Sequence, residues 1–168
     1  MRSIYCNMIA YASTLQYTLG MTDINTTNAL RLLQVADNFR AELSGEFSAV
    51  HGISVNEFFL LLHVNRSTAH RLSRVDLARR MHVSASTITR MAAPMEKIGL
   101  LGRKMDERDA RLVYVVATEA GKEKLAEALE TFSKRANYLF SDRWADEDIE
   151  NFAEMLRRLI SGSTDRLA

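Results

Sequence analysis

The 168-residue chain has little of what secreted, all-β and membrane proteins require. A single cysteine excludes an internal disulfide framework and fits a reducing compartment. Seven glycines and one proline are too few for the closely spaced turns of a β-sandwich or barrel, so the composition favours long helices. No unbroken apolar run approaches the ~18 residues that a membrane helix needs. We therefore expect a mainly α-helical, cytoplasmic protein with no membrane partner.

Positive charge is concentrated in one part of the chain. Residues 66–111 contain eleven Lys/Arg and five Asp/Glu, whereas the rest contains eleven Lys/Arg and sixteen Asp/Glu. A basic block within an otherwise acidic protein is typical of a surface that binds a polyanion. A basic, solvated helical face is the plainer alternative, and charge alone does not decide between them.

Helical periodicity and capping residues divide the chain into elements. Apolar residues spaced by three and four predict a first helix that ends at Gly52. Further helix starts are indicated by the capping residues Ser54, Ser73, Ser84 and Thr118, and a last helix is expected from Asp146. Residues 100–105 and 111–116 flank a charged turn, and the β-branched residues 113–116 favour a β-hairpin there.

The two short helices after Ser73 and Ser84, followed by a hairpin, have the outline of a winged helix-turn-helix. In such a unit the second helix can enter a major groove about 12 Å wide, while a basic hairpin tip reaches the minor groove. For any single Ser or Thr, simple helix capping is the better explanation. The combination of helices, hairpin and charge favours DNA. The predicted contacts are Ser84, Ser86, Thr87, Thr89 and Arg90 on the helix, Arg103 and Lys104 on the incoming strand, and Arg108 and Arg111 at the tip.

Three segments, residues 77–90, 95–100 and 106–111, closely resemble the MarR family of bacterial transcription regulators. The most specific piece is Asp106-x-Arg-Asp-x-Arg111, followed by a strand and Thr118-Glu-Ala-Gly121. The resemblance implies one domain over residues 21–162. Within it, a winged helix-turn-helix at 54–118 is flanked by dimerisation helices at 22–50 and 119–162. Residues 1–20 are then an extension and 163–168 a tail.

The resemblance also implies a function: a homodimeric regulator, expected to be a repressor, that binds double-stranded DNA at a pseudo-palindromic promoter site. A small aromatic or phenolic ligand would regulate it. Phe47, His51, Phe58, His63 and Arg66 are candidates to bind this ligand, although Phe47 and Phe58 are equally well explained as core. The rival hypothesis is a winged helix that binds protein and not DNA.

The sequence departs from its relatives at Ala93 and Pro94. Relatives commonly have an acidic residue at the position of Ala93, where it can pair with a wing arginine. We therefore expect Asp106 or Asp109 of the wing itself to stabilise the hairpin. Pro94 removes a donor from the second helix and crowds the Arg90 carbonyl, so a bend is expected there.

Other kinds of site have weaker support. The four histidines lack a paired metal-ligand spacing, and we expect no metal site. Cys6 lies in the extension, upstream of the first helix, where it does not match the redox-sensing cysteine of some relatives. No nucleophile elbow or glycine-rich phosphate loop is present, so we expect neither an enzyme nor a cofactor.

Overall fold

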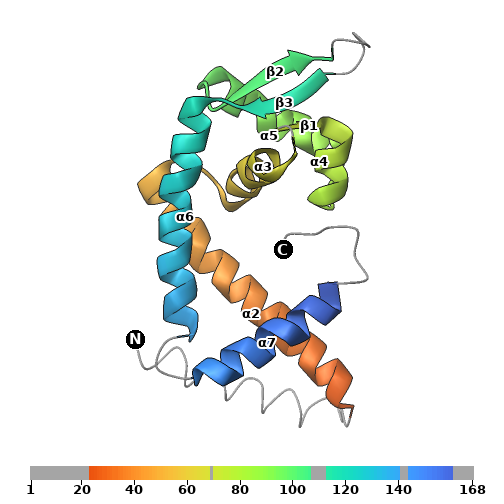
Figure 1. The fold of residues 1–168 in the computed structure, drawn as a ribbon, viewed down its shortest axis with the longest axis vertical. Coiled ribbons are helices and arrows are strands. Elements are labelled where there is room, and N and C mark those ends of the chain that lie inside the picture. The colour runs from red at the N-terminus through yellow and green to blue at the C-terminus, as the bar shows by residue number, and fades with distance from the viewer. Residues whose placement is uncertain (1–22, 69, 107–112, 141–143, 161–168) are drawn as a thin grey trace. The chain divides into compact units, whose positions relative to one another are not determined.

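The computed structural model describes residues 23–68, 70–106, 113–140 and 144–160. The chain divides into two compact units, residues 1–43 and 44–168. Helix α2 (Ile24–Glu46) begins in the first unit and ends in the second (Figure 1). The extension at 1–20 and the tail at 163–168 that the sequence predicts lie outside the described residues.

The first predicted helix ends where expected, but its last turn differs in type. After α2 the helix widens into one π-helical turn, η1 (Phe47–His51). This helical segment ends at Gly52, which has a left-handed φ of 65°. A left-handed cap favours glycine because glycine has no Cβ to clash. The π turn was not predicted, because sequence periodicity does not distinguish one wide turn from a regular one.

Helix α3 (Val55–Arg66) forms the centre of the second unit. Its predicted capping box is confirmed: the Ser54 hydroxyl accepts from the Glu57 N–H, and the Glu57 carboxylate accepts from the Ser54 N–H at 2.7 Å. Most of its side chains are buried, which identifies α3 as the core helix around which the other elements pack. The buried residues are Val55, Phe58, Leu60, Leu61, Leu62, His63 and Val64.

Helices α4 (Arg74–Arg80) and α5 (Ala85–Lys97) form the predicted helix-turn-helix. Ser73 and Ser84 cap them as expected, each accepting a hydrogen bond from the N–H three residues later. The connecting turn passes through His82 at a φ of 52°. Pro94 lies inside α5 without ending it.

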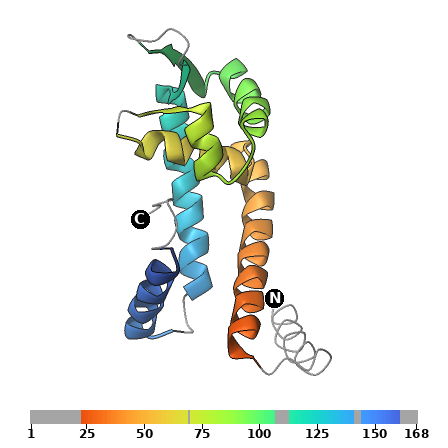
Figure 2. The ribbon, with the colours of Figure 1, turned by 90° about the vertical axis from the view of Figure 1, so that its right-hand side faces the viewer.

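The strands form one antiparallel sheet of three strands in the order β1-β3-β2. The predicted hairpin is confirmed as β2 (Leu101–Met105) and β3 (Val113–Ala117), which extend beyond the helices of this unit (Figures 1 and 2). A third strand, β1 (Arg71–Ser73), pairs with β3 and was not predicted. Three residues between two helices carry too short a pattern to indicate a strand.

Two further helices follow the sheet, α6 (Glu119–Phe140) and α7 (Asp146–Ile160). Thr118 caps α6 as predicted, its hydroxyl accepting from the Gly121 N–H at 3.0 Å. No α7 residue is fully buried: on its apolar side Ile149, Phe152 and Leu156 are half-buried, and Leu159 is 69% exposed.

None of the described helices is, by itself, long and apolar enough to cross a bilayer. A bent pair, residues 24–51 with 55–66, reaches the required length and composition together, but the second member is the buried core helix α3.

Candidate nucleic-acid interface

The first turn of α5 carries a cluster of hydroxyl groups. The Ser84 hydroxyl accepts from the Thr87 N–H at 3.1 Å, and the hydroxyls of Ser86 and Thr87 lie 2.8 and 2.9 Å from it. Three predicted contact residues are thus brought together at the start of α5. The capping bond occupies part of the hydrogen-bonding capacity of Ser84, whereas Ser86 is exposed and can reach a phosphate or base edge.

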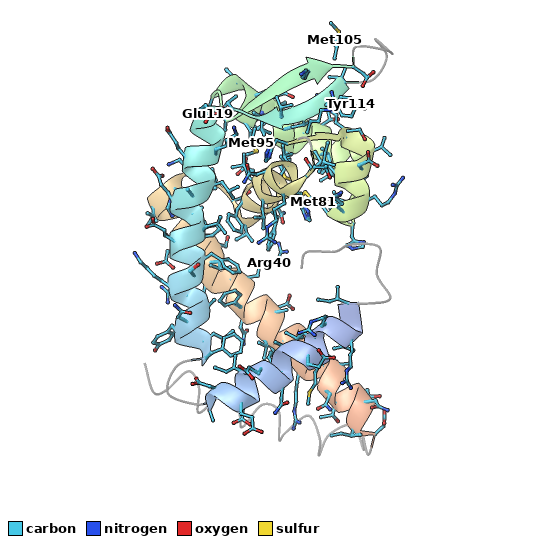
Figure 3. All side chains as sticks on the ribbon, in the orientation of Figure 1. Arg40, Met81, Met95, Met105, Tyr114 and Glu119 are labelled. Atoms are coloured by element: carbon cyan, nitrogen blue, oxygen red, sulfur yellow. The ribbon has the colours of Figure 1, made fainter. Side chains whose placement is uncertain are left out.

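The rest of α5 is anchored on one side and exposed on the other. Ile88, Ala92 and Met95 are buried, and Figure 3 labels Met95 among the core side chains. Thr89 and Arg90 are exposed on the outer side. The Thr89 hydroxyl donates to the Ala85 carbonyl at 3.0 Å, so it is engaged by the helix itself. Arg90 is the long donor that this face offers to a groove.

A carboxylate of α5 binds the wing. Glu96 accepts from the Arg103 Nε of β2 at 2.8 Å, and its side chain is only 14% exposed. This hydrogen bond, helped by the charges of Arg103 and Arg74, lowers the pKa of the Glu96 carboxyl below its usual value. Glu96 therefore remains charged at neutral pH and ties α5, the second helix of the helix-turn-helix and from here on the recognition helix, to the hairpin.

The same carboxylate reaches a third element. Arg74, the first residue of α4, lies 3.4 Å from the second Glu96 oxygen, so that Glu96 joins α4, α5 and β2. The expectation that the wing lacks a carboxylate from the recognition helix is therefore corrected. Glu96 lies three residues beyond Ala93, almost one helical turn closer to β2, and supplies it. The carboxylate within Met95-Glu96-Lys97 was the signal available in the sequence.

The two basic residues of β2 face opposite sides of the sheet, because side chains alternate along a strand. Arg103 shares the inner side with buried Val115 and carries the Glu96 ion pair. Lys104 is exposed and lies opposite Tyr114 of β3, which Figure 3 labels. The Arg71 guanidinium stacks 4.5 Å over the Tyr114 ring. Lys104 is thus available to a phosphate, whereas Arg103 is held by the protein.

The hairpin tip lies outside the described residues. Arg108, Arg111 and Asp109 belong to it, so their predicted roles in DNA contact and wing stabilisation stay predictions.

The start of α6 is fastened to the turn between α5 and β2. The Thr118 N–H donates to the Leu100 carbonyl at 3.2 Å, and the Thr118 hydroxyl donates to the Gly99 carbonyl at 2.6 Å. A Cβ added to Gly121 would lie 2.0 Å from the Leu100 carbonyl oxygen, so only glycine fits there. This close contact fixes the end of the recognition helix relative to α6.

Three of the five candidate ligand residues, Phe47, His51 and Phe58, lie close together. Phe47 and Phe58 are buried with ring centroids 5.0 Å apart, and Phe58 stacks on Phe132. His51 lies beside them, its Nε2 2.8 Å from the Thr131 hydroxyl. His63 lies five residues after Phe58, about 140° around α3, and is buried on a different side. Phe47 and Phe58 are part of the core, as the plainer of the two explanations predicts.

Residues 53–113 match the family model for the MarR family. The chain carries a MarR-family domain. It is also 30% identical over 111 residues to the HTH-type transcriptional repressor YetL of Bacillus subtilis, an alignment that covers 66% of this chain and 65% of YetL. The matched MarR segment includes all the contact residues predicted above.

Solved structures of MarR-family and other transcriptional regulators share the fold. The regulator BldR of Sulfolobus solfataricus is 27% identical with a TM-score of 0.72, and the alignment covers 84% of this chain and 99% of BldR. Sco3205 of Streptomyces coelicolor, solved in complex with DNA, is 20% identical with a TM-score of 0.73, covering 88% of this chain and 92% of Sco3205.

Proposed function

We propose that this protein is a sequence-specific DNA-binding transcription regulator, acting as a repressor in the cytoplasm and not as an enzyme. The observation that carries the proposal is the capped, buried helix α5, whose exposed side presents Ser86, Thr89 and Arg90 next to a basic hairpin. In this arrangement α5 enters the major groove and the hairpin tip reaches the adjacent minor groove. The likeness to YetL, a transcriptional repressor, supports it.

The proposal includes a homodimer. The apolar residues of α7 lie along one side of an amphipathic helix and are only partly covered within the chain: Phe152 is half-buried, but Met155 is 61% and Leu159 69% exposed. Trp144, just before α7, is 47% exposed. Apolar surface of this kind marks an association site. Two symmetric copies would place their recognition helices on half-sites about 10 bp apart, or a multiple of that.

Sedimentation tests the dimer. Leu159→Glu places a charge on the apolar side of α7 and should convert the protein to a 19 kDa monomer at micromolar concentration. Asn151→Glu adds the same charge on an exposed polar position of α7 and should leave the dimer intact. A wild-type protein that sediments as a monomer would contradict this part of the proposal.

A mobility-shift experiment with the protein's own promoter region tests the function. A regulator should bind this duplex with nanomolar affinity at physiological salt, at least 1,000-fold more tightly than unrelated DNA, as specific DNA-binding proteins do (~10³ or more). Equal, weak binding to both duplexes would favour the rival function, a winged helix that binds protein.

The proposal also includes regulation by a small aromatic or phenolic ligand. His51 is the candidate that keeps a polar contact near the aromatic core, through Thr131. Release of the promoter duplex on addition of a phenolic acid, and loss of that response in His51→Leu, would support it.

A further inference from the structure

The side of α5 that faces away from the core has an unusual mixture of groups. With about 100° between successive residues, Ser86, Arg90 and Ala93 lie opposite the buried Ile88 and Met95. Thr89 is exposed beside them. Arg90 therefore lies in the middle of this outer side. Beside it are Thr89 and Ala93, two residues whose side chains carry methyl groups.

Ala93 can contribute to base discrimination in one way. Its side chain has no donor or acceptor, yet it is exposed one turn beyond Thr89 on the side that would meet DNA. The 5-methyl group of thymine is the apolar feature of base edges in the major groove, and alanine and threonine methyls contact it. An exposed alanine on a recognition helix can therefore favour thymine by contact with this methyl group.

Thr89 is prepared for the same contact. Its hydroxyl donates to the Ala85 carbonyl at 3.0 Å, which holds the oxygen against the helix backbone. The γ-methyl is then the group of Thr89 that can meet a base. Residues four apart on a helix have Cβ atoms about 6 Å apart, a span that reaches two successive base pairs with a rise of about 3.4 Å.

Position 93 is not required to hold the wing. Glu96 binds Arg103 at 2.8 Å and Arg74 at 3.4 Å, so a partly buried carboxylate already joins the recognition helix to β2 and α4. A side chain at position 93 can therefore face the groove.

We infer that Thr89 and Ala93 form a methyl-reading pair that selects thymine beside the base pair contacted by Arg90. This inference rests on the proposed DNA-binding function and adds the class of base that the site prefers. It predicts binding sites with one or two thymines next to a guanine in each half-site.

The test begins with a duplex that the full-length protein selects from random-sequence DNA. The affinity of the protein for this duplex is measured by fluorescence anisotropy at one fixed salt concentration. Each thymine of a half-site is then replaced by deoxyuridine, which removes the 5-methyl and keeps the pairing. Burial of one methyl corresponds to about 0.8 kcal/mol, so we expect about a four-fold loss of affinity at the thymines that are read. Thymines elsewhere should show no change.

Thr89→Ser connects the effect to the protein. Serine keeps the hydroxyl that donates to Ala85 and removes the methyl, so the variant should have an unchanged thermal midpoint. On the thymine duplex it should lose about four-fold in affinity, and on the deoxyuridine duplex it should lose nothing further. Thr26→Ser, a matched change at the first turn of α2 where the hydroxyl bonds Asp23, should bind both duplexes as wild type does.

The outcomes separate the inference from the function on which it rests. Failure to select any duplex would remove the proposed function itself. Tight, selective binding that is insensitive to every deoxyuridine replacement would overturn the inference alone. Equal losses for Thr89→Ser on both duplexes would also overturn it, because the role of Thr89 would then be structural.

Discussion

At the scale of single residues, the clearest constraint is the contact between Gly121 and the Leu100 carbonyl. The carbonyl belongs to the turn after the recognition helix, and it also accepts from the Thr118 N–H. It cannot move away without breaking this bond. A single missing Cβ thus sets how closely α6 approaches the helix-turn-helix.

Gly121→Ala should destabilise the protein by about 1–3 kcal/mol, the usual cost of overpacking, because its Cβ would lie 2.0 Å from a backbone oxygen. Gly45→Ala is the matched control: it lies inside α2 with nothing within 4 Å of the added Cβ, so it should stabilise by about 0.5–1 kcal/mol. Urea unfolding of both variants measures the difference. Equal stability of the two would show that the α6 contact is not tight.

Arg90 belongs to the same scale. If it forms a bidentate contact to a guanine, Arg90→Ala should cost about 1–3 kcal/mol on the selected duplex and relax discrimination at one base pair. Competition binding with single-base variants of the duplex measures this. A uniform loss across all variants would instead assign Arg90 to a phosphate, and an unchanged affinity would remove it from the interface.

At the scale of elements, Glu96 is the residue through which α4, α5 and β2 act together. It carries two ion pairs to different elements from a position only 14% exposed. In the proposed complex the recognition helix and the wing contact two grooves at a fixed separation, and a charged link between them reduces their relative freedom.

The lowered pKa of Glu96 makes this link dependent on pH. A carboxyl whose folded pKa lies below its unfolded value of about 4.3 stabilises the fold above that value, and the contribution is lost as the pH falls through the folded pKa. Glu96→Gln should therefore cost about 1–2 kcal/mol at pH 7, and the difference from wild type should shrink below about pH 4. Unfolding curves of both proteins from pH 3 to 7 measure it.

Glu119→Gln is the control for that experiment, since Glu119 pairs with Lys122 on the surface and is 82% exposed. It should cost little at any pH. A Glu96→Gln penalty that stays constant from pH 3 to 7 would contradict an ionic role.

The sequence was sufficient to predict structural features that depend on residues close together in the chain. The capping bonds of Ser54, Ser73, Ser84 and Thr118 extend over three residues and carry a recognisable pattern. Contacts between elements were less predictable. The Glu96–Arg103 pair depends on how the strand returns past the helix, and β1 forms only because β3 lies beside it. The bond of Thr89 to Ala85, which changes what that residue can offer DNA, likewise needed coordinates.

At the scale of the whole molecule, the distribution of charge is the property that matters for a polyanion. Some of the basic residues in the block 66–111 are used internally, as Arg74 and Arg103 are by Glu96. Binding to DNA then depends more strongly on those that remain. Among them, Arg90 and Lys104 are exposed, and Arg108 and Arg111 belong to the hairpin tip.

The dependence of DNA affinity on salt can count these contacts. Each neutralised phosphate contributes about −0.9 to the slope of log Kobs against log salt concentration. A wing arginine that binds in the minor groove contributes to affinity and to this slope on both half-sites of a dimer. Arg108→Ala and Arg111→Ala should therefore each weaken binding and reduce the slope by up to about two, while the thermal midpoint stays nearly unchanged. Arg103→Ala should behave differently, lowering the thermal midpoint because Glu96 loses the closer of its two ion-pair partners. Titrations of the selected duplex at four salt concentrations, with a thermal melt of each variant, distinguish the two roles.

If Arg108→Ala and Arg111→Ala both bind DNA as wild type does, the hairpin does not contact DNA, and a protein partner becomes the better explanation for the wing.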